Sequence, residues 1–357
     1  MKRRFGPAAL TLPLVLLLGA AGSPLHAQVL RGHLTNAVGG AEGGAIVLAL
    51  DSTGTVRGRT LSGTAGGYTI MLSLPGRYHL RVLRVGYPAW ESAVVRLGES
   101  ELAQVDGKLP SVPIVVQAVT VAGKSCEVRP AEGDAAATLL EEGRKAVTSA
   151  DELLREGGYR FKVRRHTRHL DRSGSLITDD STGEIESSTW PISSLPVSEL
   201  ERGGFVQVMD PDMGPTYYGP DAQVLFSDFF LGNHCFFVSR TRPVDSGLVA
   251  LRFQVVQSRK LADLEGALWL DPTNLHLSHL DFQYTPLPDW APKGSASGRL
   301  DFIQLPSSIW IVRRWSLRVP QPERTQGTNI YSLHGYVEQT GEVTGVRTKT
   351  GEVVLGE

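Results

Sequence analysis

The sequence has almost no net charge and no long apolar run. It contains 36 lysine and arginine residues against 37 aspartate and glutamate residues, for a formal net charge of −1 at pH 7. A balance this even provides no overall field toward nucleic acid or an anionic lipid surface, so we expect no nucleic-acid partner. No run of about 18 apolar residues occurs after the N-terminal region, and we therefore expect no transmembrane segment in the mature chain.

The motifs of common hydrolases are also absent. The sequence has no His-x-x-Glu or His-Glu-x-x-His, which zinc peptidases use, and no Gly-x-Ser-x-Gly nucleophile elbow. Two histidine pairs, His166 with His169 and His276 with His279, fall on expected strands, where a spacing of three sends the side chains to opposite faces. We expect no catalytic residue, no metal and no cofactor.

Acidic pairs are the remaining candidates for catalysis. Asp221 with Asp228 is one such pair, and it lies among turn-forming residues. Aspartate is common there because its side chain accepts hydrogen bonds from nearby backbone amides. We therefore interpret these residues as caps of local structure, with a catalytic pair or a calcium site as the alternatives.

The first 27 residues have the pattern of a secretory signal peptide. A basic stretch at residues 2–4 precedes a short apolar core at residues 12–21, and Leu-His-Ala at residues 25–27 is an acceptable cleavage site. The pattern predicts export, with a mature chain that begins at Gln28 and is either periplasmic or secreted.

Cysteine is scarce, and export would place the two cysteines of the chain in an oxidising compartment. Cys126 and Cys235 are the whole supply, and an oxidising compartment favours a disulfide between them. Such a bridge would connect the end of the first domain to the middle of the second. The alternative is two buried free thiols. Two thiols alone make no tetrahedral metal site, and their neighbours lack the ligand spacing of one.

Residues 28–122 predict a β-sandwich of seven short strands. In one of them Tyr78, Leu80 and Val82 alternate with polar residues, which is the period of a strand with one buried face. Turn-forming residues such as Pro75-Gly76 separate the segments. The expected strands are residues 29–34, 45–50, 56–61, 68–72, 77–82, 94–97 and 114–121. Their even spacing is typical of a sandwich.

One group of residues within this domain forms a distinctive sequence motif. The residues Thr64, Gly67-Tyr68, residues 75–82 and residues 84–87 resemble the recurring pattern of the carboxypeptidase regulatory-like (transthyretin-like) family. The family's module is found ahead of many TonB-dependent receptors and on secreted carboxypeptidases. The resemblance implies a seven-stranded transthyretin-like sandwich that binds or stabilises, without a peptidase centre.

The rest of the chain predicts an α+β domain with one helix and an antiparallel meander. After a linker at residues 123–133, the domain covers residues 134–357, and its helix is expected at 134–156 because apolar residues recur on one face. Successive hairpins follow, and the tail from residue 336 is either a final hairpin or a frayed end. A helix before a long meander is similar to the half-barrel of periplasmic lipoprotein carriers.

An aromatic segment at residues 217–237 is the most unusual part of this domain. Its candidate ligand-groove residues are Tyr217, Tyr218, Phe229 and Phe230, because aromatic rings offer large apolar faces to a ligand. The alternative, which we favour, is that these rings belong to the core. Five tryptophans also fall in this domain, namely Trp190, Trp269, Trp290, Trp310 and Trp315. Exposed tryptophans would stack on sugar rings, but Trp269 and Trp310 sit among alternating apolar residues and favour core packing.

These observations together predict a mainly β protein of the cell envelope. Its expected function is non-catalytic binding or scaffolding, with an envelope protein as the partner. The alternatives are a carrier of a lipid or other hydrophobic ligand, which requires an apolar cavity in the second domain, and a glycan-binding protein, which requires exposed aromatic residues in a row. The oligomeric state is not predicted.

Overall fold

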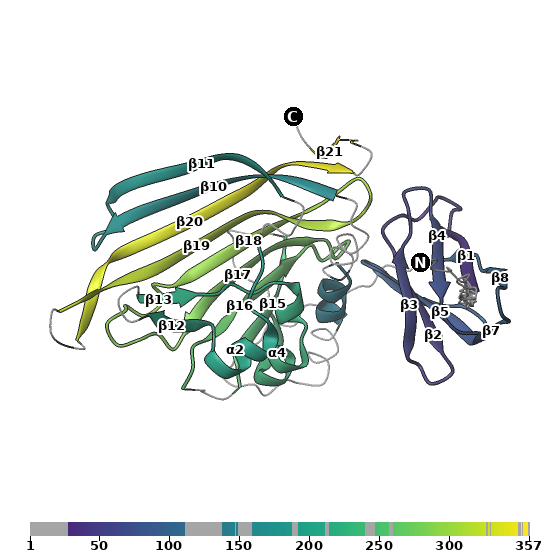
Figure 1. Ribbon diagram of the computed structural model, residues 1–357, viewed down its shortest axis with the longest axis horizontal. Coiled ribbons are helices and arrows are strands. Elements are labelled where there is room, and N and C mark those ends of the chain that lie inside the picture. The colour runs from purple at the N-terminus through teal and green to yellow at the C-terminus, as the bar shows by residue number, and fades with distance from the viewer. Residues whose placement is uncertain are drawn as a thin grey trace, which may run out of the picture.

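A computed structural model of the chain describes residues 28–110, 138–146, 148, 159–187, 192–210, 214–239, 247–256, 260–325, 328, 330–348, 351 and 353–355. It has two β-rich parts, a small sandwich and a large curved sheet (Figure 1). The predicted mainly β fold is confirmed. The expected signal peptide (1–27), the strand at 114–121 and the linker at 123–133 lie outside the described residues.

The first part is a sandwich of two sheets around one apolar core. One sheet has the order β4-β1-β8, with β9 also paired to β1, and the other has the order β3-β2-β5-β6, with β7 also paired to β5. The strands are β1 (Gln28–Thr35), β2 (Ile46–Asp51), β3 (Val56–Leu61), β4 (Gly67–Leu72), β5 (Gly76–Arg84), β6 (Tyr87–Glu91), β7 (Val95–Leu97), β8 (Leu102–Gln104) and β9 (Gly107–Lys108). Six expected strands are present, and β6, β8 and β9 were not predicted. All three are short, so their sequences show little periodicity.

Hairpin turns in both parts use an aspartate in the same way. The Asp51 Oδ1 atom accepts hydrogen bonds from the amides of Thr53 and Thr55, at 2.9 and 3.0 Å. Asp171 does the same for Ser173 and Ser175, at 2.8 and 2.9 Å. The side-chain hydrogen bond from Ser173 is the largest of the causes that lower the pKa of Asp171. These bonds explain why an Asp followed by Ser, Thr and Gly was a reliable turn signal.

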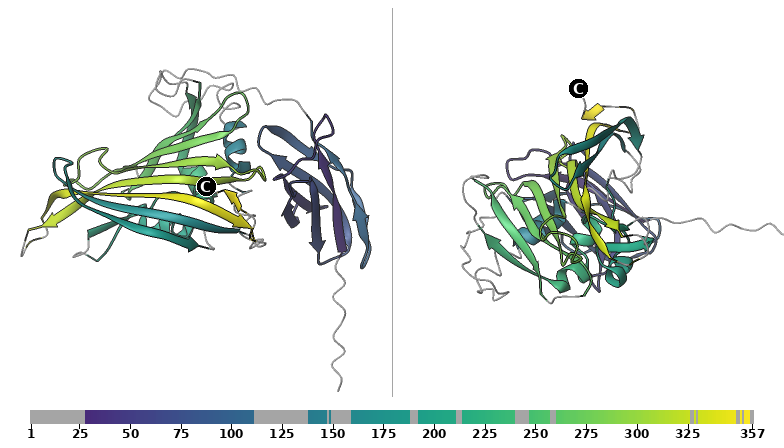
Figure 2. Two further views of the ribbon diagram at one scale, coloured as in Figure 1. Left: turned by 90° about the horizontal axis from the view of Figure 1, so that it is seen from above. Right: turned by 90° about the vertical axis from the view of Figure 1, so that its left-hand side faces the viewer.

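The second part is built on a ten-stranded antiparallel sheet. Its order is β11-β10-β20-β19-β18-β17-β16-β15-β14, with β21 paired to β20, and its curvature is visible in Figure 2. The strands are β10 (Tyr159–Asp171), β11 (Leu176–Ser187), β14 (His234–Ser239), β15 (Val249–Val255), β16 (Asp263–Leu270), β17 (Leu277–Thr285), β18 (Ser297–Gln304), β19 (Trp310–Arg324), β20 (Tyr331–Thr348) and β21 (Val353–Leu355). Consecutive pairing from β14 to β20 is the predicted meander.

Short helices pack against one face of this sheet. They are α2 (Val197–Gly203), α3 (Ala222–Leu225) and α4 (Asp228–Asn233), and a hairpin of β12 (Val206–Asp210) and β13 (Gly214–Tyr217) lies beside them. Leu200, Val224 and Phe230 from these helices share one core with sheet residues such as Leu268 and Phe282. The three helices were not predicted, because each is too short to show a helical period. Among the described residues, no helix has the length and apolar character needed to cross a membrane.

The predicted helix (134–156) is helical over its described residues 138–146, which lie between the two parts of the molecule (Figure 1). Residues 134–137 and 149–156 lie outside the described residues. Leu139 and Ala146 bury one face of it in the core of the second part. Gly143 permits this close packing, since a Cβ atom at Gly143 would lie 2.8 Å from Leu268 Cδ2. One face of the helix therefore packs into the second part.

An adjoining stripe of the same helix contacts the first part through a buried ion pair. Lys145 Nζ lies 2.5 Å from Glu142 Oε1, and their side chains are only 4 % and 1 % exposed. Glu142 Oε2 accepts a hydrogen bond from the amide of Gly86 at 2.6 Å, and Lys145 Nζ donates one to the carbonyl oxygen of Tyr87 at 2.9 Å. The charged pair is thus completed by backbone groups of the β5–β6 turn.

The hairpin between β18 and β19 forms a second contact between the two parts. Arg84 Nη2 donates a hydrogen bond to Ser308 Oγ at 3.3 Å. Ile309 packs with Ile46 and Leu61 of the first part in a small apolar cluster. The interface thus combines polar and apolar contacts.

The predicted disulfide remains a prediction. Cys235 lies half-buried on β14, whereas Cys126 lies outside the described residues. Peptide mapping under non-reducing conditions checks the pairing in exported protein. We expect one linked peptide that contains both cysteines, with a mass two hydrogens below that of the reduced pair. Recovery of both cysteines as alkylated free thiols would contradict it.

Candidate functional site

The four candidate groove residues lie in or against the core. Phe230 is fully buried, with its ring centroid 3.8 Å from that of His234 and 5.4 Å from that of Phe253. Tyr217 is also buried and packs edge to face on Tyr284, with ring centroids 5.3 Å apart. Tyr218 and Phe229 are half-buried against the same core. This arrangement is the core alternative of the sequence analysis, and none of the four residues lines the cavity described next.

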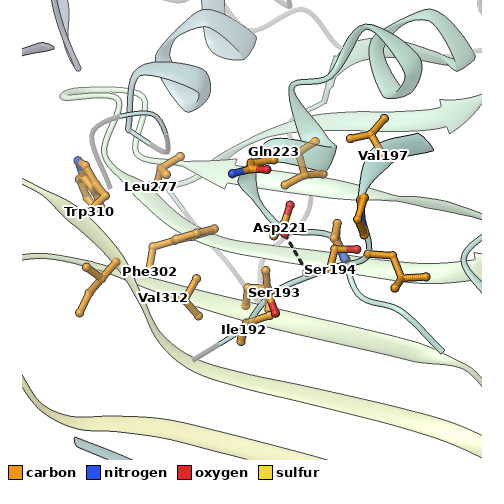
Figure 3. A pocket seen from close by; sticks show the side chains of 16 residues that line it. Ile192, Ser193, Ser194, Val197, Asp221, Gln223, Leu277, Phe302, Trp310 and Val312 are labelled. Carbon is orange, nitrogen blue, oxygen red and sulfur yellow. Dashed lines mark hydrogen bonds between the residues drawn. The ribbon is translucent and has the colours of Figure 1, made fainter. Parts of the chain in front are cut away.

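An apolar cavity of about 310 Å³ lies between the sheet and the segments that precede α2 and α3. Its walls come from three adjacent strands, β17, β18 and β19, and from residues 192–197 and 220–225 (Figure 3). The lining residues are Ile192, Ser193, Ser194, Leu195, Pro196, Val197, Pro220, Asp221, Gln223, Leu225, Leu277, Leu300, Phe302, Trp310, Ile311 and Val312. The cavity is small for a ligand pocket, because such pockets range from about 300 to 1,000 Å³.

Asp221 holds the two non-sheet segments together. Its Oδ2 atom accepts a hydrogen bond from the amide of Ser194 at 2.8 Å, shown as a dashed line in Figure 3. Its Oδ1 atom accepts one from the amide of Val224 at 3.0 Å in the first turn of α3. Both oxygens thus anchor backbone, which confirms the capping interpretation of Asp221. This carboxylate therefore helps to fix residues 192–197 over the sheet, together with Ile192, Leu195 and Val197, which pack against the core.

The polar groups of the cavity are gathered on one side. Ser193, Ser194, Asp221 and Gln223 come from the two connecting segments and lie near one another in Figure 3. The labelled strand residues on the sheet side, Leu277, Phe302, Trp310 and Val312, offer apolar surface. The Ser194 Oγ atom is buried and has no hydrogen-bond partner among the described residues. The cavity is therefore amphipathic, with an apolar wall and a polar rim.

The only ionisable residue in the lining is acidic. Asp221 is the one charged residue among the lining residues, which contain no Lys, Arg or His. Outside the lining, the His276 ring packs against Trp310, with ring centroids 5.2 Å apart. Burial is the main cause that lowers the pKa of His276. A histidine with a lowered pKa is neutral at pH 7, so it adds no positive charge beside the cavity.

The structure describes both of the tryptophans that were expected to pack in the core. Trp269 and Trp310 are 6 % and 5 % exposed, which confirms that both pack in the interior. Trp269 stacks on His279, with centroids 5.4 Å apart, and does not line the cavity. Trp190 lies outside the described residues. Within those residues, no three His, Cys, Asp or Glu side chains gather into a set that could hold a metal.

Most of the cavity was not identifiable from the sequence. Asp221 and Trp310 were noticed, but as a cap and as a core residue. The remaining lining residues come from five separate stretches of chain, and each stretch looks ordinary by itself. The one available signal was Asp221 just before a short apolar segment, which predicts a helix start. It does not reveal which strands lie opposite.

No protein-family model matches the chain, and no curated protein matches it. Among solved structures, a 9R-lipoxygenase from Cyanothece is 13 % identical, with 81 % of this chain aligned to 43 % of that one at a TM-score of 0.19. A candidate carbohydrate-binding protein from Bacteroides uniformis is 8 % identical over 87 % and 95 % of the two chains, at 0.20. The major pilin subunit BcpA of Bacillus cereus is 7 % identical over 92 % of each, at 0.20. Similarity this low leaves function to be argued from the chain's own residues.

Proposed function

We propose that this chain is a non-catalytic binding protein of the bacterial cell envelope and that its second domain holds an apolar ligand in the cavity beneath residues 192–197. The observation that carries the proposal is the cavity itself. It has a volume of about 310 Å³ and a mostly apolar lining, and it lies between the curved sheet and the α2–α3 segments. Export rests on the N-terminal pattern of the sequence, and the sandwich domain rests on its resemblance to the carboxypeptidase regulatory-like family.

The size of the cavity supports a small ligand. A dry protein cavity of about 150 Å³ accommodates benzene, so a volume twice as large fits about twelve non-hydrogen atoms. An alkyl chain of medium length has this size. Transfer of such a chain from water to an apolar wall is favourable by about 0.8 kcal/mol for each buried CH₂ group. The apolar wall therefore supplies the affinity.

The chemistry of the lining supports binding in preference to catalysis. A general acid or base needs a titratable group directed at the ligand. Asp221 is the one ionisable lining residue, and both of its oxygens accept backbone hydrogen bonds. Serine needs an adjacent base to become a nucleophile, and no histidine lines the cavity.

Thermal unfolding in the presence of 1-nonanol tests the proposal. A ligand that binds only the folded chain raises the melting temperature as its concentration rises. We expect this rise for the native chain and not for Val312→Trp, because the larger ring fills the cavity from β19. Val353→Trp is the matched control, since Val353 is 55 % exposed on β21. A native chain whose melting temperature is unaffected by 1-nonanol would contradict the proposed function.

A further inference from the structure

The polar rim of the cavity indicates which ligand head group it accepts. We infer that the cavity selects amphiphiles with an uncharged polar head, such as an alcohol, and discriminates against the carboxylate of a fatty acid. This inference rests on the proposed function and concerns the same site. In this arrangement Asp221 is a specificity-determining residue and Ser194 binds the head group.

The negative charge of Asp221 disfavours a carboxylate head group. A carboxylate head at the rim would lie near Asp221, and the lining contains no basic residue to compensate either charge. Like charges a few ångströms apart disfavour ionisation by one or more pKa units, and one unit corresponds to a factor of ten in affinity. The ionised acid is therefore expected to bind at least tenfold more weakly than the alcohol of the same chain length.

The unpartnered Ser194 hydroxyl favours a head group that forms a hydrogen bond. Its Oγ atom is buried without a partner among the described residues, while its own amide is held by Asp221. A buried hydroxyl without a hydrogen bond is unfavourable. Because the Oγ atom has less than 1 Å² of accessible surface, rotation about χ1 must first turn it into the cavity, and a ligand that then supplies the bond removes the cost. A hydroxyl head satisfies Ser194 whether the serine donates or accepts. An alkane satisfies neither role.

The orientation of the ligand follows from the two sides of the cavity. The head lies against Ser194 and Gln223, and the chain lies along Phe302 and Val312 of the sheet (Figure 3). Trp310 completes the apolar wall with its ring. Its Nε1 atom has no hydrogen-bond partner among the described residues, but its ring packs at 72° to that of His276. Because Trp310 lies away from Ser194 and Asp221 (Figure 3), we assign head-group binding to the serine and not to the indole.

The test compares 1-nonanol with nonanoate at pH 7 on the full mature chain, by calorimetric titration. We expect the native chain to bind 1-nonanol at least tenfold more tightly. Asp221→Asn should reduce this preference to about threefold or less, because the charge is gone. The amide oxygen can accept only one of the two backbone hydrogen bonds that Asp221 accepts. Asp228→Asn, an exposed acid in the first turn of α4, is the matched control and should leave the preference unchanged.

Ser194→Ala keeps the test decisive if Asp221→Asn does not fold. This variant removes only the hydroxyl and is expected to weaken 1-nonanol binding by about 3- to 10-fold, while the affinity for nonane stays constant. Equal affinities of the native chain for 1-nonanol and nonanoate would overturn the inference and leave the proposed function intact. An equal loss of affinity for nonane and for 1-nonanol in Ser194→Ala would also overturn the inference and leave the proposed function intact. Failure of all three ligands to bind would instead contradict the proposed function.

Discussion

Lys145→Met is expected to lower the free energy of unfolding by about 3–5 kcal/mol, because it leaves Glu142 as a buried charge without its partner. The native pair is almost fully buried and only 2.5 Å apart. The substitution also removes the hydrogen bond to the Tyr87 carbonyl. Urea unfolding of the native and variant chains measures the loss.

The same helix provides a matched control. Glu141 and Arg144 form an ion pair with the same spacing, at 3.7 Å, but their side chains are 44 % and 58 % exposed. Arg144→Met is expected to cost about 0–1 kcal/mol. The double variant Glu142→Leu/Lys145→Met is expected to lose less than the sum of its single variants, since it leaves neither charge alone. Equal losses for Lys145→Met and Arg144→Met would contradict the role of burial.

The pH dependence of Glu142 has a definite sign. Burial is the largest cause that raises the pKa of Glu142, although Lys145 acts in the opposite direction. The Glu142 carboxyl group therefore stays protonated to a higher pH in the folded chain than in the unfolded chain. The stabilisation from this group is fully present below its unfolded pKa, about 4.5, and is lost as pH rises through the folded pKa. Relative to Glu142→Gln, the native chain should become less stable across that range.

Phe230→Ala is expected to cost about 3–5 kcal/mol, the range for removing a fully buried phenylalanine. Phe230 has no exposed surface and lies at the centre of an aromatic cluster with Phe205, His234 and Phe253. The substitution would leave a void among rings from α4, β14 and β15. Calorimetric melting of the variant measures the effect.

This substitution also separates the core role of Phe230 from the groove role. If Phe230 serves the core alone, the variant binds 1-nonanol with unchanged affinity below its melting temperature. Phe229→Ala, at the half-buried neighbouring position, is the control and is expected to be less destabilising. A loss of 1-nonanol affinity in Phe230→Ala, with little loss of stability, would restore the groove role.

Much of the strand pattern was predictable because it is local. Residues 56–61 were expected as a strand and form β3, and the alternation of Tyr78, Leu80 and Val82 places those side chains in the sandwich core. Aspartate turns were predictable for the same reason, since their hydrogen bonds reach only a few residues along the chain.

The longest strand was not predictable from local pattern. The tail from residue 336 was expected to be a final hairpin or a frayed end, yet β20 begins at Tyr331 and lies between β10 and β19. Its glycines were misleading. Gly341 is paired with Trp315, and a Cβ atom there would collide with the indole ring. The glycine that suggested a loose end is instead required for a large neighbour on the next strand.

The hairpin at residues 305–309 connects the contact between the two domains to the wall of the cavity. Ile309 packs against the first domain, and the next residue, Trp310, is part of the cavity wall. A ligand that displaces Trp310 acts on a residue whose backbone neighbour is fixed at the interface. Linkage is reciprocal. If docking of the two domains changes the ligand affinity by some factor, then ligand binding changes the docking equilibrium by the same factor. Because the first domain contributes no residue to the cavity lining, any effect that it has on ligand binding would have to pass through contacts such as this hairpin.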